Sequence, residues 1–361
     1  MGQTKSKIAS PKNIKKELSI YGYSWQVNRN PPRLKTRDEI NVQDFIIKGR
    51  KDETIVRVPG TIDGQQFIID GCENCDFYVM DFCAEVSVDD CKNCRFFIGP
   101  VEGSFFIRNC ENSKVTVACR QLRTRDCKNI DLILYAQGRP VIESSTNVRF
   151  GCFDVFYVGL SEQFKNAQLS IFNNKWNVVH DFTPAEGGAL NYSYIHGAKS
   201  FDHLKPLHKV APEFISEQEE ELNKTQRLVP LTTGNSDPSI KSNTTIIFLP
   251  GKSDEAMRFL QNAHSQYQDK FFVSNSKEWK FSKTEVDQIF ANSAKSEELK
   301  HAKQESTKGP IIVLAIVEKE PGTLAQCVAT CASEKSFYIT QDGSESDKLN
   351  HYVFNTHTVE T

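Results

Sequence analysis

The sequence lacks a long apolar run. No stretch of its 361 residues approaches the ~18 apolar residues that a membrane-spanning helix needs. Residues 1–16 also lack the apolar core of a secretory signal. Without a signal for export, the 11 cysteines are expected to be reduced thiols. These absences predict a soluble intracellular protein, and the length leaves room for two domains.

An excess of charge of one sign is also missing. The net charge is −2, from 44 Lys and Arg against 46 Asp and Glu, so the overall charge does not indicate a nucleic-acid partner. There is no Walker A loop with its lysine and no Rossmann fingerprint. We therefore expect the chain neither to bind nucleic acid nor to hydrolyse GTP by itself.

What the sequence does contain is a repeat in its first half, aligned on a Cys-x-Asn motif. The asparagines lie 19, 19, 17 and 18 residues apart, and Ser145 replaces the cysteine in the last copy. They are Asn74, Asn93, Asn112, Asn129 and Asn147. Apolar and polar residues alternate around them with period two, which is typical of strands. A repeat of this length, rich in strands and free of helix signals, predicts the coils of a parallel β-helix.

Alternation also fixes the direction of the side chains in the most arginine-rich copy of the repeat. Leu122 and Thr124 fall in columns that are apolar in the other copies, so both are expected to point inward. Gln121, Arg123 and Arg125 lie between and beside them and are expected to point outward together.

The two outward arginines have different neighbours in the repeat. The column of Arg125 also holds Asp70, Asp89, Arg108 and Glu143. Parallel strands lie about 4.8 Å apart, so this column can form a ladder of ion pairs. The column of Arg123 holds Ile68, Ser87, Phe106 and Val141, with no carboxylate. Arg123 is therefore either an ordinary solvated arginine or a group that binds an external anion.

Two pairs of cysteines have the spacing of a four-cysteine zinc site. They are Cys72-x-x-Cys75 and Cys91-x-x-Cys94. Later copies of the repeat place serine, isoleucine or valine in the second cysteine column, so this column accepts small or apolar residues. The pattern is better explained as core packing, and no metal site is expected.

The motif Gln121-Leu122-Arg123 matches the Gln-x-Arg signature of the tubulin-folding cofactor C domain family. That domain is a parallel β-helix that activates small GTPases. Five more segments resemble a member of the family that activates Arf-like protein three at the ciliary base, and the resemblance is strong over residues 51–184. These segments are Gly64-Gln65-Gln66-Phe67, Asp70-Gly71-Cys72-Glu73-Asn74-Cys75, Ile142-Glu143-Ser144-Ser145, Phe150-Gly151-Cys152-Phe153 and Ser170-Ile171-Phe172-Asn173-Asn174.

The resemblance implies that the chain acts on the active site of another protein. Arg123 is the implied arginine finger, which stabilises the charge on the γ-phosphate in the transition state. Gln121 is expected to orient the finger, and Glu143 to hold both Arg123 and Arg125. The implied GTP- and partner-binding set is Gly103, Ser104, Arg120, Gln121, Leu122, Arg123 and Phe182. From the sequence, Phe182 is equally well explained as a core aromatic residue.

The implied partner is an Arf-like small GTPase in its GTP state, which supplies both the GTP and the Mg²⁺. The chain would then be a GTPase activator with no cofactor and no enzymatic activity of its own, and we expect a monomer. The implied role is the release of lipidated cargo and membrane trafficking to the cilium. Two alternatives remain: a non-catalytic, membrane-anchored scaffold or effector of an Arf-like GTPase, and a tubulin-folding cofactor.

The first residues carry a lipidation pattern. Met1-Gly2-Gln3-Thr4-Lys5-Ser6 fits N-myristoylation of Gly2. One myristoyl chain binds membranes only marginally, so a second signal is expected. The nearby basic residues are Lys5, Lys7, Lys12, Lys15 and Lys16. They predict weak, salt-sensitive attachment to the cytoplasmic face of the plasma membrane, at the ciliary base where the cell has a cilium. The alternative is a disordered, solvated tail.

We expect three parts along the chain. A basic tail and linker cover 1–37, and a right-handed parallel β-helix with its cap and connecting segment covers 38–238. The β-helix is expected to open with a strand at 44–47 and to end in a mostly non-repeating cap at 170–182, anchored by Phe172 and Trp176.

The third part, 239–361, is expected to be a separate α/β domain. Its order of strands and helices predicts a ferredoxin-like sheet. It resembles the nucleoside diphosphate kinase fold, which needs a histidine nucleophile in an Asn-x-x-His-Gly-Ser-Asp motif. Residues 341–347 contain no histidine, and His351 lies beyond them. We therefore expect this domain to be inactive as a kinase.

Overall fold

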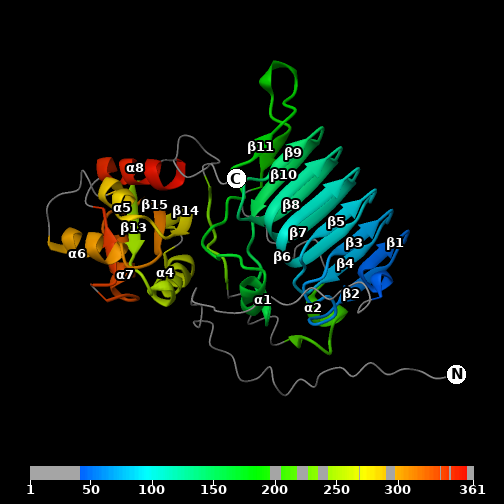
Figure 1. Cartoon of the computed structure of the whole chain (residues 1–361), viewed down its shortest axis with the longest axis horizontal. Coiled ribbons are helices and arrows are strands. Elements are labelled where there is room, and N and C mark those ends of the chain that lie inside the picture. The colour runs from blue at the N-terminus through cyan, green and yellow to red at the C-terminus, as the bar shows by residue number, and fades with distance from the viewer. Residues whose placement is uncertain are drawn as a thin grey trace.

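The computed structural model describes residues 41–195, 205–217, 227–234, 243–267, 269–289, 297–333, 335–340 and 343–355. The predicted myristoylation site at Gly2 and the basic residues of the tail lie outside these ranges. Figure 1 shows a stack of parallel strands beside a smaller α/β part. Within the described ranges, every helix is too short or too polar to cross a bilayer.

Twelve strands of the described residues form one sheet, which coils into a β-helix (Figure 1). They are β1 (Ile46–Lys48), β2 (Thr54–Arg57), β3 (Phe67–Asp70), β4 (Asp76–Val79), β5 (Val86–Asp89), β6 (Arg95–Arg108), β7 (Glu111–Arg125), β8 (Lys128–Ala136), β9 (Val141–Glu143), β10 (Thr146–Cys152), β11 (His180–Asp181) and β12 (Tyr192–Tyr194). The first face stacks β1, β3, β5, the C-terminal halves of β6 and β7, β9 and β11. The second face stacks β2, β4, the N-terminal halves of β6 and β7, β8, β10 and β12. All of these pairings are parallel, which confirms the predicted fold.

The inward columns of the repeat are confirmed by the register. On the first face, Phe67, Val86, Phe105 and Leu122 lie opposite one another in turn, and all four are fully buried. On the second face, Phe77, Phe96, Val115, Leu132 and Phe150 do the same. The rings of Phe77 and Phe96 stack with their centroids 5.0 Å apart. No single coil could bury these side chains alone, so each coil depends on its neighbours for a core.

The asparagines of the repeat are explained by the backbone at the corner of each coil. All five have φ between 51° and 56°, in the left-handed region that Asn and Gly tolerate best. The residue before each cysteine position is also left-handed, at Gly71, Asp90, Asn109, Asp126 and Ser144. The amide of Asn129 donates to the Oδ1 of Asn112 at 2.8 Å, and the amide of Asn147 donates to the Oδ1 of Asn129 at 2.8 Å. The asparagines therefore both allow the turn and link successive coils.

Three details of the β-helix differ from the sequence-based prediction. The opening strand begins at Ile46, because Val42–Phe45 forms a 3-10 helix. A helix that was not predicted, α1 (Leu160–Asn166), precedes the cap. The segment after α1 continues the β-helix, because β11 pairs with β9 and β12 pairs with β10. These two short strands extend both faces by one more layer. The predicted anchors Phe172 and Trp176 are both buried.

The C-terminal part is a four-stranded antiparallel sheet in the order β14-β15-β13-β16. Its strands are β13 (Thr244–Phe248), β14 (Phe271–Trp279), β15 (Ile311–Glu318) and β16 (Phe337–Ile339), and its helices are α4 (Ser253–Gln266), α5 (Lys283–Ile289), α6 (Glu297–Ser306), α7 (Thr323–Ala329) and α8 (Gly343–Asn350). This order is that of a split β-α-β sheet, so the ferredoxin-like prediction is confirmed. The capping box before α5 also forms, since Ser282 and Glu285 exchange hydrogen bonds of 2.6 and 3.3 Å.

Buried polar contacts join the two parts. Ser170 Oγ donates to Glu278 Oε2 at 2.7 Å. Asn173 accepts from the Glu278 N–H at 2.7 Å and donates to its carbonyl at 3.1 Å. Glu278 is only 8% exposed, so Ser170 compensates for part of the cost of burying its carboxylate. The C-terminal sheet therefore packs against the cap of the β-helix.

Asn129 offers a test of the corner geometry. Asn129→Ala removes the amide from the ladder and strains the left-handed position, whereas Asn129→Gly removes only the amide. We expect the alanine variant to lose about 1–2 kcal/mol of unfolding free energy and the glycine variant clearly less. Equilibrium denaturation in urea measures both. Equal losses would mean that the conformation at φ 56° is not the constraint.

Candidate functional site

Arg123 lies on the first face of the β-helix, near the C-terminal end of β7. Its Cα partners are Phe106 on β6 and Val141 on β9, and Val141 in turn lies opposite His180 on β11. Its side chain is exposed, and the neighbouring Leu122 and Thr124 are buried. The alternation therefore works as predicted, and the rigid sheet holds the guanidinium outward.

The contacts of the Arg123 side chain are few. The Nη2 of Arg123 donates to the Gln121 Oε1 at 3.4 Å, which is long for a hydrogen bond. Within the described ranges, no carboxylate lies within ion-pair distance of this guanidinium. Gln121 is the residue that was expected to orient it, and its side chain lies on the same face. The guanidinium thus keeps most of its donors available for an external anion.

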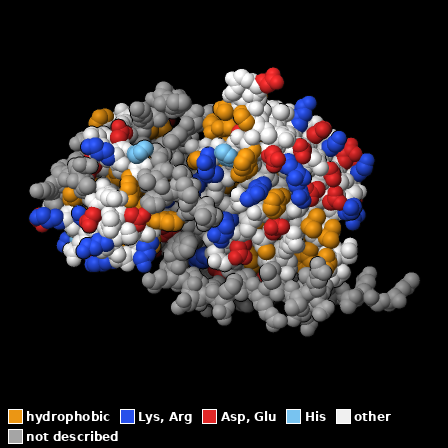
Figure 2. All heavy atoms as spheres, turned by 45° about the horizontal axis from the view of Figure 1, so that its top comes forward, with side chains coloured by type: hydrophobic (Ala, Val, Ile, Leu, Met, Phe, Trp, Pro, Cys, Tyr) orange, Lys and Arg blue, Asp and Glu red, His pale blue; other side chains and the backbone are white. Residues whose placement is uncertain are grey.

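The other arginines of this face are paired. Arg108 forms a bidentate ion pair with Asp89, at 2.6 and 2.9 Å. Arg125 pairs with Asp126, with 3.3 Å between Nε and Oδ2. Figure 2 shows side chains of both signs gathered over the β-helix. The predicted ladder of ion pairs therefore exists, although Arg125 takes its partner from the adjacent corner rather than from the next coil.

Glu143 was expected to hold Arg123 and Arg125. The structure places Glu143 directly opposite Arg125 in the register, but its carboxylate forms no ion pair with either arginine. The left-handed corner at Asp126 brings a closer acid to Arg125. Glu143 is exposed, so its carboxylate remains on the same face as the guanidinium of Arg123 without being bound to it.

The residues expected near the nucleotide lie on the strands and turns around Gln121. Ser104 is the Cα partner of Gln121. Gly103 approaches the preceding coil so closely that a Cβ would lie 2.9 Å from the Ala84 carbonyl oxygen, so the position needs glycine. Arg120 is exposed, and its Nε donates to the Glu102 carbonyl at 2.8 Å.

Leu122 requires a correction. It was placed in the GTP- and partner-binding set, but its side chain is fully buried in the column of Phe105. A residue between two outward residues of a strand must point inward, so Leu122 can position Gln121 and Arg123 but cannot offer its side chain to a partner.

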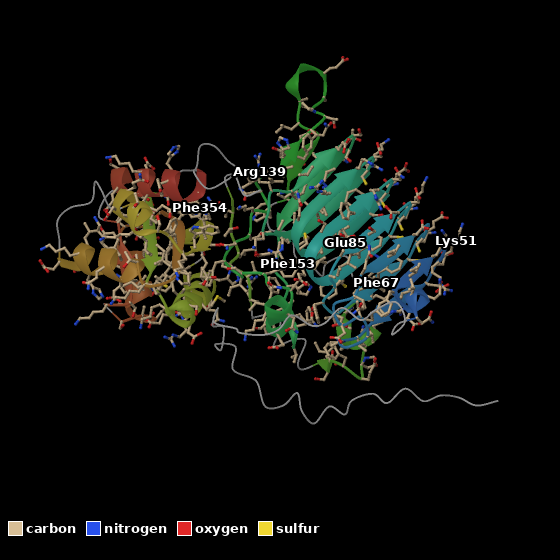
Figure 3. All side chains as sticks on the ribbon, viewed as in Figure 1. Lys51, Phe67, Glu85, Arg139, Phe153 and Phe354 are labelled. Carbon is tan, nitrogen blue, oxygen red and sulfur yellow. The ribbon has the colours of Figure 1, made fainter. Side chains whose placement is uncertain are left out.

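Phe182 is exposed, not a core residue. It is 62% exposed, and its ring contacts His180 edge to face, with the centroids 4.5 Å apart. Its N–H donates to the Ile142 carbonyl at 2.9 Å, which fixes it beside β9. The sequence analysis missed His180, which extends the column of Arg123, and Arg139, which lies exposed before β9 and is labelled in Figure 3. The pairing of β11 with β9 brings His180 here, and no local pattern signals it.

Six of the cysteines form two buried columns inside the coils, which also include Ser113 and Ser145. Each hydroxyl or thiol donates to the carbonyl two residues before it, as in Cys91 to Asp89 at 3.2 Å, Ser113 to Glu111 at 2.9 Å and Ser145 to Glu143 at 2.8 Å. Serine can therefore replace cysteine without loss of this bond. In the described part of the chain, no group of three or more His, Cys, Asp and Glu is placed to hold a metal ion.

These features define a cofactor C type β-helix that presents Arg123, which has no ion pair among the described residues, and the exposed Phe182 on the same face. A family model for tubulin binding cofactor C matches residues 64–182. Protein XRP2 of Danio rerio is 38% identical over 297 residues, which cover 81% of this chain and 74% of that protein. Protein XRP2 of Homo sapiens is 41% identical over 229 residues, 63% of this chain and 62% of that protein. The chain therefore belongs to the XRP2 family, and the predicted resemblance to the cofactor C domain family is confirmed.

The solved structures include a distant likeness. A nucleoside diphosphate kinase of Aquifex aeolicus covers 33% of this chain and 99% of that protein, with 11% identity and a TM-score of 0.26. His351 lies in the turn of π-helix after α8 and is exposed.

Thiol reactivity tests the buried columns. Burial raises the pKa of Cys72 and Cys75 in the columns, and outside them it raises the pKa of Cys152 to about 11 and that of Cys327 to about 12, so these thiols form little thiolate at pH 8. All eleven cysteines are buried and reduced. We expect an aromatic disulfide reagent to titrate the native protein slowly and to titrate 11 thiols at once in denaturant. Rapid reaction of the native protein, or fewer thiols after unfolding, would contradict this packing.

Proposed function

We propose that this protein is a GTPase-activating protein for an Arf-like small GTPase, of the Arf-like protein three type, and that Arg123 is its arginine finger. The observation that carries this proposal is the exposed guanidinium of Arg123, held outward by a rigid sheet and free of any carboxylate among the described residues. Its neighbours on the same face, Arg108 and Arg125, are both engaged in ion pairs.

The proposed chemistry is phosphoryl transfer in the active site of the partner. The partner supplies GTP and Mg²⁺ and positions the attacking water. Arg123 then stabilises the charge that spreads over the γ-phosphate in the transition state. A guanidinium suits this role because it stays charged and presents a planar fork of donors. Gln121 orients the fork, as its contact of 3.4 Å with Arg123 suggests.

The remaining site residues surround the finger and define the proposed docking surface. Ser104 and Arg120 lie on one side, and Phe182 lies on the other, beyond β9. Phe182 provides an apolar contact for the partner, because the residue is 62% exposed. Glu143 is free to accept a donor of the partner or to receive Arg123 as it moves. In the cell, we propose that this activity releases lipidated cargo for traffic to the cilium.

The test is single-turnover GTP hydrolysis by a panel of Arf-like GTPases. Arg123→Ala should reduce the stimulated rate by about 10³- to 10⁵-fold, the usual contribution of an arginine finger. Binding to the GTP-loaded partner should fall little, because the docking surface remains. Arg149→Ala is the matched control, since Arg149 is an exposed arginine of the second face that pairs with Asp131. It should leave stimulation unchanged.

Three outcomes would overturn this proposal. Equal stimulation by Arg123→Ala and the parent chain would remove Arg123 from the mechanism. Tight binding to a GTP-loaded partner with no stimulation by the parent chain would instead support a non-catalytic scaffold or effector. Activity only in a tubulin-folding assay would support the cofactor alternative.

We also propose that myristoylated Gly2 and the five lysines of the tail attach the protein to the cytoplasmic face of the plasma membrane. A myristoyl chain alone binds marginally, and each basic residue near an anionic leaflet adds about 1 kcal/mol. Gly2→Ala should therefore release the protein from the membrane fraction, and raised salt should weaken attachment of the parent chain. An unchanged membrane fraction for Gly2→Ala would refute the lipid anchor.

A further inference from the structure

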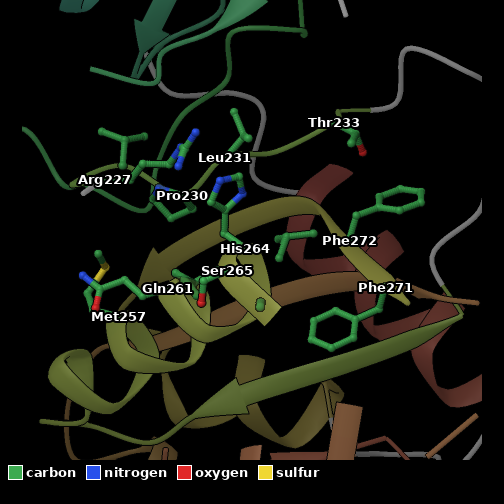
Figure 4. Close-up of a pocket in the computed structure, with 14 residues that line it drawn as sticks. Arg227, Pro230, Leu231, Thr233, Met257, Gln261, His264, Ser265, Phe271 and Phe272 are labelled. Carbon is green, nitrogen blue, oxygen red and sulfur yellow. The ribbon is translucent and has the colours of Figure 1, made fainter. Parts of the chain in front are cut away.

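A pocket of about 250 Å³ lies where the connecting segment crosses the C-terminal sheet (Figure 4). We call it the strap pocket, because residues 227–234 cross it as a strap over α4 and β14. The strap is fixed to β14, since the Thr233 N–H donates to the Val273 carbonyl at 3.0 Å and the Gly234 N–H donates to the Ser274 carbonyl at 2.9 Å. The pocket is separate from the face that carries Arg123.

The strap is also fixed to the β-helix. Trp176 Nε1 donates to the Thr232 hydroxyl at 3.0 Å. The thiol of Cys152 lies 3.7 Å from both the Thr232 hydroxyl and the Pro230 carbonyl. The strap pocket therefore lies at the junction of the two parts of the protein, a place where ligand sites are common.

The lining of the pocket is apolar with two basic groups. The apolar side chains include Met257, Leu260, Phe271, Val273 and the partly exposed Leu231. The basic groups are Arg227 from the strap and His264 from α4, drawn on the same side of the pocket in Figure 4. No Asp or Glu is among the residues that line it. The positive charge of Arg227 therefore favours an anion with an apolar body.

Arg227 is the most unusual of these residues. Its Nε is buried and has no hydrogen-bond partner in the described part of the chain. Burial lowers the pKa of Arg227, and the charge of the nearby Asp154 opposes that shift. Burial and the charge of Arg227 together lower the pKa of His264, which places the two groups close together. A buried donor without a partner is rare in native proteins, and a bound anion is one explanation for it.

The size of the pocket limits what it can hold. A cavity of ~150 Å³ holds one benzene molecule, and pockets for drug-sized ligands begin near 300 Å³. A volume of about 250 Å³ therefore suits a chain of several methylenes but not a long acyl chain or a nucleotide.

We propose that the strap pocket binds a medium-chain carboxylate, with the hydrocarbon against Met257, Leu260 and Phe271 and the carboxylate on Arg227 and His264. A bound carboxylate supplies the acceptor that Arg227 lacks. It also fills the space beneath the strap, so its binding stabilises the contact between the β-helix and the C-terminal sheet. This inference does not depend on the proposed GTPase-activating function.

Isothermal titration of the full chain with butyrate, hexanoate and octanoate tests the proposal. Each added pair of methylenes should strengthen binding about tenfold, because every buried methylene adds a constant increment. Octanol should bind at least tenfold more weakly than octanoate, and octylamine should not bind measurably. Octanoate should also raise the unfolding temperature.

Variants separate the site from non-specific binding. Arg227→Gln should weaken octanoate binding at least tenfold, and Arg227→Lys should retain part of it because the charge remains. Arg139→Gln, which alters an exposed arginine of the β-helix, is the matched control and should bind as the parent chain does. Circular dichroism checks that each variant folds.

Any of three results would overturn the inference. Octanol or octylamine could bind as well as octanoate, the affinity could be independent of chain length, or Arg227→Gln and Arg227→Lys could both bind octanoate as the parent chain does. Absence of octanoate binding at millimolar concentration would overturn it as well.

Discussion

The register between successive coils is the constraint on which the rest of the structure depends. Each coil turns at a left-handed corner, and the asparagines at three successive corners, Asn112, Asn129 and Asn147, bond to one another. The repeat of the corners keeps each inward column aligned over the whole stack. A slip of one residue in β7 would turn Leu122 outward and Arg123 into the core, because neighbouring side chains of a strand point to opposite faces.

The same register decides which arginine is available. Arg108, Arg123 and Arg125 all point outward from the first face, so exposure alone does not distinguish them. Arg108 lies opposite an aspartate of the previous coil, and Arg125 adjoins an aspartate at the corner. Exposed ion pairs contribute only about 0–1 kcal/mol each to stability, so their main effect is on the position of the side chains. They fix two guanidinium groups, whereas the one at Arg123 has no ion pair among the described residues.

The two parts of the chain form one packed structure rather than two independent units. The buried Glu278 of β14 bonds to Ser170 and Asn173 of the cap, and the strap is hydrogen-bonded to both sides. A single apolar cluster includes Phe153 and Phe172 of the β-helix as well as Ile246 and Phe271 of the C-terminal sheet. The C-terminal part therefore buries apolar side chains of the cap.

The sequence by itself determined the coil period, the inward columns, the outward direction of Arg123 and the ferredoxin-like order of the C-terminal part. These follow from the alternation of apolar and polar residues, which acts over a few residues of backbone. The tertiary structure alone decided that Arg125 pairs with Asp126 rather than Glu143, that His180 and Phe182 join the face of Arg123, and that Arg227 meets His264 in a pocket. Those contacts depend on side-chain rotamers and on the packing of segments far apart in the chain. The bond between Ser170 and Glu278 is a further example. Local periodicity carries no information about rotamers or about such long-range packing.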